Sequence, residues 1–147
     1  MKIVLASDHA GFPLKEQLVS RLESQGHQIL DLGPFSTESV DYTDFAQSLC
    51  REVLQGNAEK GILVCNSGVG MSIAANRFKG IRAALCLFPK MAYYARRHND
   101  ANVLALGGGN TGLFLASDIV DVFLEEEFEG GRHKRRTDKF DLAEVNK

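Results

Sequence analysis

The feature that most constrains the fold lies in the middle of the chain, where a short apolar run breaks directly into a glycine loop. Residues 62–64 are Ile, Leu and Val, a run typical of a strand buried on both faces of a parallel sheet. Gly68 and Gly70 follow, and small residues after them predict a helix. Glycines let the main chain turn sharply, and unpaired N–H groups at a helix start suit an anionic ligand. Cys65 ends the strand, where open α/β sheets carry their chemistry.

The rest of the chain repeats this alternation of strand and helix. Predicted strands cover residues 2–7, 28–32, 62–64, 81–87 and 103–106. Predicted helices follow Gly11, with Pro13 in the first turn, and cover residues 41–55, the segment after Gly70, residues 89–97 and the segment from Leu113. Five alternating strands predict a three-layer α/β sandwich with a parallel sheet, of the Rossmann-like or flavodoxin-like class. A chain of 147 residues fits one domain. A last helix at about 131–145 is expected to pack on that domain or on a partner subunit.

Composition excludes several classes of function. The net charge is −2 and the pI is near 6.1, which argues against binding to nucleic acid or to an anionic membrane. No apolar run reaches the roughly 20 residues of a spanning helix. Cys50, Cys65 and Cys86 are widely spaced, so they form neither a disulfide framework nor a zinc-ligand pattern. We therefore expect free thiols, no metal and a cytoplasmic protein.

The loops that follow the predicted strands should meet at one edge of the sheet. Their candidate site residues are Asp8 and His9, residues 65–70, Phe88, and residues 107–110. Taken singly, each has a plainer explanation. Cys65 could be inert core, His9 could cap a helix, and His98 could be a polar helix exit. The helix start after Cys65 favours its thiolate form, whereas Cys50 and Cys86 lack that context. The basic run at residues 132–136 is typical of a solvated surface, and the glycine loop matches no nucleotide-binding pattern.

Five blocks of sequence together resemble the family of type B ribose-5-phosphate isomerases. The blocks are SDHAG at 7–11, DY at 41–42, CNSGVGMSIAANRFKGIRA at 65–83, RRHNDANVLALG at 96–107 and GGRHKRR at 130–136. The resemblance spans almost the whole chain in the order and spacing of the family. The same family includes the isomerases of galactose 6-phosphate and allose 6-phosphate.

The resemblance implies an aldose–ketose isomerase without metal or cofactor, which interconverts ribose 5-phosphate and ribulose 5-phosphate through an enediolate. It assigns the proton transfer between carbons to Cys65 and the opening of the sugar ring to His98. The residues that it assigns to substrate binding are Asp8, His9, Tyr42, Asn66, Ser67, Gly68, Val69, Gly70, Asn99, Arg132 and Arg136. The two arginines would hold the phosphate. It also implies a homodimer, open to further pairing of dimers, with sites built from both subunits.

The chemistry agrees with these assignments, but two departures from the family pattern matter. A thiolate is a suitable base, and the N–H groups of residues 67–70 with the Ser67 hydroxyl could stabilise the enediolate oxygen. The family commonly has Gly and Thr where Asn66 and Ser67 stand, which leaves a six-carbon sugar phosphate open as the substrate. A branch of the family uses a glutamate as base where this chain has Met71, so Cys65 remains the candidate. A sugar-phosphate-binding module without turnover and a Cys-His hydrolase are the competing hypotheses.

Overall fold

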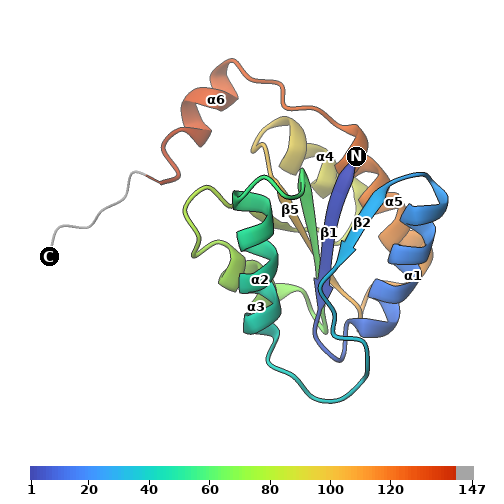
Figure 1. The fold of residues 1–147 in the computed structure, drawn as a ribbon. Helices are drawn as coiled ribbons and strands as arrows, with labels where there is room; N and C mark the ends of the chain where they lie inside the picture. Colours follow the sequence, from blue (N-terminus) through green and yellow to red (C-terminus); the bar gives the residue numbers. More distant parts are fainter. Residues whose placement is uncertain (142–147) are drawn as a thin grey trace, which may run out of the picture.

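The computed structural model describes residues 1–141, which form a parallel sheet covered by helices on both faces (Figure 1). The strands are β1 (Lys2–Ser7), β2 (Gln28–Asp31), β3 (Lys60–Cys65), β4 (Ala83–Leu85) and β5 (Val103–Gly107). The helices are α1 (Phe12–Ser24), α2 (Tyr42–Leu54), α3 (Val69–Ala75), α4 (Pro89–Arg97), α5 (Leu113–Glu125) and α6 (Arg132–Thr137). The predicted three-layer α/β class with five parallel strands is confirmed.

The order of the strands places β3 at the centre of the sheet. The order is β2-β1-β3-β5-β4, and every neighbouring pair is parallel. A flavodoxin-like sheet has the order 2-1-3-4-5, so the last two strands exchange places here. Because β1 and β5 flank β3, the loops after these three strands are direct neighbours.

Two separate apolar clusters fill the space on either side of the sheet. Helices α2 and α3 cover one face, where Leu49 and Met71 pack on Val4 and Leu63. Helices α1, α4 and α5 cover the other face, where Phe123 belongs to the second cluster (Figure 1). The central strands are therefore buried on both faces, which explains their continuous apolar runs.

A buried ion pair joins α1 to the end of β2. Lys15 is fully buried, and its Nζ lies 2.7 Å from Oδ1 of Asp31. The same Asp31 oxygen accepts the N–H of Gly33 at 2.8 Å, and the Gly33 carbonyl accepts the N–H of Ser7 at 2.9 Å. This network fixes the loop after β2 beside the carboxyl end of β1.

Several predicted boundaries differ from the structure; for example, the strand predicted at 62–64 covers Lys60–Cys65. The strand predicted at 81–87 covers only Ala83–Leu85, because the side chain of Asn76 bonds both the N–H and the carbonyl of Ala83 at 2.8 Å and caps the sheet edge. The strand predicted at 28–32 ends at Asp31.

The helix predicted at 131–145 also differs, since it covers Arg132–Thr137 within the described part of the chain. The rest of its predicted apolar stripe, at Leu142 and Val145, lies outside the described residues. None of the helices within residues 1–141 has the length and apolar character needed to span a bilayer.

Candidate active site

Cys65 is held at the carboxyl end of the central strand, under the glycine loop. It is the last residue of β3 and lies opposite Gly107 of β5. The N–H of Gly68 donates to Sγ of Cys65 at 3.1 Å, a bond that stabilises a thiolate. Cys65 is only 5% exposed and belongs to the apolar cluster under α2 and α3.

Gly68 cannot be replaced by another residue without strain. Its φ is +78°, in the left-handed region that favours glycine. A Cβ at this position would lie 2.5 Å from Cδ1 of Leu85 and 3.0 Å from the carbonyl carbon of Leu106. The position of the N–H that contacts Cys65 therefore depends on glycine.

Main-chain contacts lock the cysteine loop between its two neighbouring loops. The N–H of Gly108 donates to the Cys65 carbonyl at 2.7 Å, and the N–H of Gly109 donates to the Asn66 carbonyl at 2.9 Å. On the other side, a Cβ on Gly11 would lie 2.1 Å from the Val64 carbonyl oxygen. The glycine turn at residues 107–110 thus lies beside the cysteine loop and holds it in place through these hydrogen bonds.

Asp8 and Tyr42 lie beside this loop, and His9 follows Asp8. Asp8 is buried, and its Oδ1 accepts the N–H of Gly11 at 2.8 Å. His9 accepts the N–H of Val40 on Nδ1 at 3.2 Å, which leaves Nε2 for a ligand. The ring of Tyr42 occupies the space beside Gly70, where a Cβ would lie 2.7 Å from its Cζ.

The loop residues themselves divide into engaged and available donors. The N–H of Val69 donates to Oγ of Ser67 at 3.3 Å, and the N–H of Gly68 is taken by Cys65. Two of the N–H groups expected to face a ligand are therefore already engaged, while the Ser67 hydroxyl hydrogen remains to be donated. Asn66 is exposed. A Cβ on Gly109 would lie only 2.2 Å from its Oδ1.

The other predicted site residues gather at the opposite edge of the sheet. His98 caps the carboxyl end of α4, and its ring stacks on that of His133 with a centroid distance of 4.1 Å and an interplanar angle of 7°. His133 belongs to α6, which stands beyond the edge where β1 begins (Figure 1). Arg132 and Arg136 are exposed and four residues apart on α6, so they share one face of that helix. Asn99 is exposed and lines a cavity of about 420 Å³.

Register shows that Cys65 and residues 98–102 lie at opposite edges of the sheet. The N–H of Gly61, near the start of β3, bonds the carbonyl of Asn102 at 3.0 Å, so residues 98–102 lie at the amino edge. Cys65 is four residues further along β3, about 13 Å at roughly 3.3 Å per residue. We call Asp8, His9, Tyr42 and residues 65–70 the cysteine half-site, and His98, Asn99, Arg132 and Arg136 the histidine half-site.

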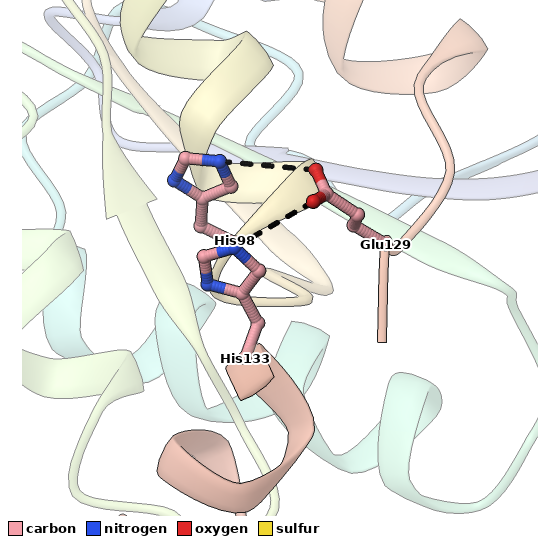
Figure 2. Close-up of side chains that lie close together, drawn as sticks. All are labelled: His98, Glu129 and His133. Carbon is pink, nitrogen blue, oxygen red and sulfur yellow. Dashed lines mark ion pairs between the residues drawn. The ribbon is translucent and has the colours of Figure 1, made fainter. Parts of the chain in front are cut away.

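Glu129 joins the histidine half-site, although no sequence motif pointed to it. Its Oε2 lies 4.0 Å from Nε2 of His98, and its Oε1 lies 3.9 Å from Nε2 of His133 (Figure 2). The ligand atoms of these three residues lie within 4.8 Å of one another, so the set has the composition of a metal site. Nearly parallel imidazoles do not direct their lone pairs at one point, and Arg97 pairs with Glu129 at 3.3 Å. The arrangement as it stands therefore does not fit a cation.

Burial sets the protonation of three further groups. The pKa of Cys50 is raised to about 11 and that of Cys86 to about 12 by burial, so both stay neutral thiols at physiological pH. This agrees with their prediction as structural residues. The pKa of His133 is lowered from its ordinary value by burial, by His98 and by Arg132 and Arg136, against an opposing effect of Glu129.

The chain is similar to known proteins in family profile, in sequence and in structure. Residues 3–140 match the profile of the family described as Ribose/Galactose Isomerase. The chain is 45% identical to ribose-5-phosphate isomerase B of Escherichia coli, over 97% of this chain and 96% of that protein. A crystal structure of a ribose 5-phosphate isomerase from Thermotoga maritima superposes with a TM-score of 0.96 at 54% identity, covering 97% of this chain and 98% of the other. The type B ribose 5-phosphate isomerase of Trypanosoma brucei gives a TM-score of 0.93 at 45% identity, with 97% and 98% covered.

Proposed function

We propose, since the chain belongs to the Ribose/Galactose Isomerase family, that it is an aldose–ketose isomerase which interconverts ribose 5-phosphate and ribulose 5-phosphate. The single observation that carries the proposal is the Gly68 N–H bonded to Sγ of Cys65 at the carboxyl end of β3. This arrangement provides a stabilised thiolate beside a loop of hydrogen-bond donors. The names of the relatives from Escherichia coli and Thermotoga maritima support the same reaction.

The proposed reaction moves one proton between adjacent carbons. The Cys65 thiolate removes the proton on C2 of the open-chain aldose, the C–H electrons form the C1=C2 bond, and O1 takes the negative charge. The Ser67 hydroxyl, whose oxygen accepts the N–H of Val69, would donate to O1. Transfer of the O2 proton to O1 and return of the proton from the Cys65 thiol to C1 then give the ketose. No metal is required by these steps.

A pentose phosphate is the proposed substrate. The exposed side chain of Asn66 lies against Gly109 on the turn after β5. The Escherichia coli relative is likewise named for ribose 5-phosphate. Allose 6-phosphate and galactose 6-phosphate are the comparison substrates in the test below.

We also propose that the working enzyme is a homodimer in which each site takes its cysteine half-site from one subunit and its histidine half-site from the other. The proposal is supported by the position of the two half-sites at opposite edges of one sheet. Arg132 and Arg136 would then hold the phosphate of a sugar whose reacting carbons lie at the partner's cysteine loop. We further propose a cytoplasmic location, which is supported by three free, buried cysteines.

The reaction is tested by the uptake of solvent deuterium into the sugar. Purified protein in D₂O is incubated with ribose 5-phosphate, allose 6-phosphate or galactose 6-phosphate, and deuterium at C1 and C2 is followed by NMR. Rapid exchange with the pentose and slow exchange with both hexoses are expected. Binding of the pentose without any exchange would instead show a non-catalytic module, and faster exchange with a hexose would change the substrate.

The shared site is tested by mixing two inactive variants. Cys65→Ala and His98→Asn each leave one half-site intact, so a heterodimer contains one complete site and one with both defects. After random exchange of subunits, half of the dimers are mixed, and activity should recover to about a quarter of the wild-type value. If the mixture stays as inactive as its parts although exchange has been verified by mass spectrometry, each site belongs to a single chain.

A further inference from the structure

The contacts of Glu129 single it out among the acidic residues that follow α5. Its two carboxylate oxygens face two different imidazoles, at 4.0 Å from Nε2 of His98 and 3.9 Å from Nε2 of His133 (Figure 2). These separations are ion-pair contacts rather than hydrogen bonds. His133 is 4% exposed, and its Nε2 has no hydrogen-bond partner among the described residues. A carboxylate thus directly faces the histidine expected to open the sugar ring.

The carboxylate is held in place by α4. Arg97, beside His98, pairs with Oε2 of Glu129 at 3.3 Å, and its carbonyl accepts the N–H of Glu129 at 3.0 Å. Arg97 also pairs with Glu126 at 3.4 Å and lies over the ring of Tyr93. Both the main chain and the side chain of Glu129 therefore contact Arg97, at the end of the helix that carries His98.

We propose that Glu129 is a positioning residue for ring opening, which keeps the proton of neutral His98 on Nε2 and leaves Nδ1 as the base that faces the sugar. This role rests on the proposed isomerase function. Nδ1 points away from the carboxylate (Figure 2), and an anion beside Nε2 favours the tautomer that carries its proton there. The neutral ring of His133, stacked at 4.1 Å, limits rotation of the His98 ring.

The step balances with His98 as the only proton carrier. Nδ1 takes the proton of the O1 hydroxyl of cyclic ribose 5-phosphate, the O–H electrons form the C1=O double bond, and the bond from C1 to the ring oxygen breaks. The ring oxygen then takes the proton from Nδ1. During this exchange His98 is an imidazolium, which the anionic Glu129 stabilises.

The charges around His98 explain why a carboxylate is needed there. Arg97 lies beside it, Arg132 and Arg136 belong to the helix that carries the stacked His133, and Tyr94 contacts its ring at 4.9 Å. The guanidinium groups disfavour an imidazolium, and Glu129 and Glu126 are the nearby anions that oppose them. Removing the charge of Glu129 should therefore leave the imidazolium formed during ring opening without this stabilising anion.

Glu129→Gln tests the proposal, with Glu127→Gln as the matched control. Glu127 is exposed and forms no ion pair within residues 1–141. In Glu129→Gln, kcat/KM for ribose 5-phosphate should fall by about 10-fold or more. Glu129→Asp, which retains the charge, should keep most of the wild-type kcat/KM. A purely structural role would lower the turnover of ribose 5-phosphate and of ribulose 5-phosphate alike.

Ribulose 5-phosphate separates ring opening from proton transfer. Its C5 oxygen carries the phosphate, so it stays acyclic and needs no ring opening before it forms the enediolate. Deuterium should enter C1 of ribulose 5-phosphate at a near wild-type rate in Glu129→Gln. Equal losses in both assays, or behaviour identical to Glu127→Gln, would overturn the positioning role. Absence of exchange in the wild-type protein would instead overturn the proposed isomerase itself.

Discussion

The two half-sites are built from different materials. The cysteine half-site is largely main chain, since Gly68, Gly108 and Gly109 supply its bonds and close contacts. The histidine half-site consists of side chains at the end of α4 and on α6, with Arg132 and Arg136 exposed. The first is fixed by the sheet that carries it, whereas the second offers flexible cationic side chains to a ligand.

This difference matches the tasks proposed for the two regions. Proton transfer needs a base and donors held to within a fraction of an ångström, and interlocked loops at a sheet edge provide that. Holding a phosphate far from the reacting carbons needs charge and reach, which arginines on a helix provide. Substitutions should therefore alter the chemical step in the first region and substrate affinity in the second.

Cys65→Ala should have the largest effect of any substitution considered. Removal of the base should lower kcat by about 10²–10⁴-fold and abolish deuterium exchange, with little change in substrate affinity. Cys86→Ala is the control, because Cys86 is equally buried and its thiol stays neutral, with a pKa of about 12. Retention of full exchange by Cys65→Ala would place the base elsewhere.

Gly68→Ala should follow, because it disturbs the main chain of the cysteine half-site. The positive φ and the contact with Leu85 should cost about 1–3 kcal/mol of unfolding free energy. Displacement of the Gly68 N–H should lower kcat by about 100-fold. Gly112→Ala is the matched control, since a Cβ there would meet no atom within 4 Å and the φ of Gly112 is −72°. Urea unfolding and turnover assays check both effects, and a stable, active Gly68→Ala would show that the loop tolerates movement.

The cysteine half-site was largely predictable, because its signals are local in sequence. An apolar run followed at once by glycines identifies a strand end, and parallel strands bring such ends to one edge. The sequence could not predict that the N–H groups of Gly68 and Val69 donate to the side chains of Cys65 and Ser67. The short extent of β4 was equally hidden, since it depends on the side chain of Asn76.

The histidine half-site was predictable only through family resemblance. Its residues come from segments 30 or more positions apart, and a basic run on a short helix is indistinguishable from a solvated surface. Glu129 illustrates the limit most clearly. Its spacing of four from His133 is compatible with a helical contact, but nothing local connects it with His98.

Arg136→Ala should mainly weaken binding of the substrate. Loss of one charge-assisted contact to a phosphate corresponds to about 1.5–3 kcal/mol, which should raise KM by roughly 10–100-fold with a smaller change in kcat. Arg135→Ala is the control, as this neighbour is also exposed and forms no ion pair within the described part of the chain. An unchanged KM for Arg136→Ala would remove the phosphate role from this half-site.

Protonation of His133 should give the smallest effect, seen in the pH dependence of stability. Its pKa is lowered in the folded protein by burial and by the neighbouring His98, Arg132 and Arg136. The unfolded chain therefore binds more protons as the pH falls through the ordinary histidine value of about 6.5, and the contribution of His133 to stability is full above that pH and lost below it.

Urea midpoints measured from pH 8 to pH 5.5 test this effect. They should fall less steeply for His133→Gln than for the wild-type protein, whatever their absolute values. His27→Gln, which removes a partly exposed histidine that precedes β2, is measured alongside as the control for the loss of a histidine. If the urea midpoints of all three proteins fall equally with pH, folding does not disfavour protonation of His133. The stacked pair at the histidine half-site would then tolerate charge on both rings, and the contrast with the tightly determined cysteine half-site would become sharper.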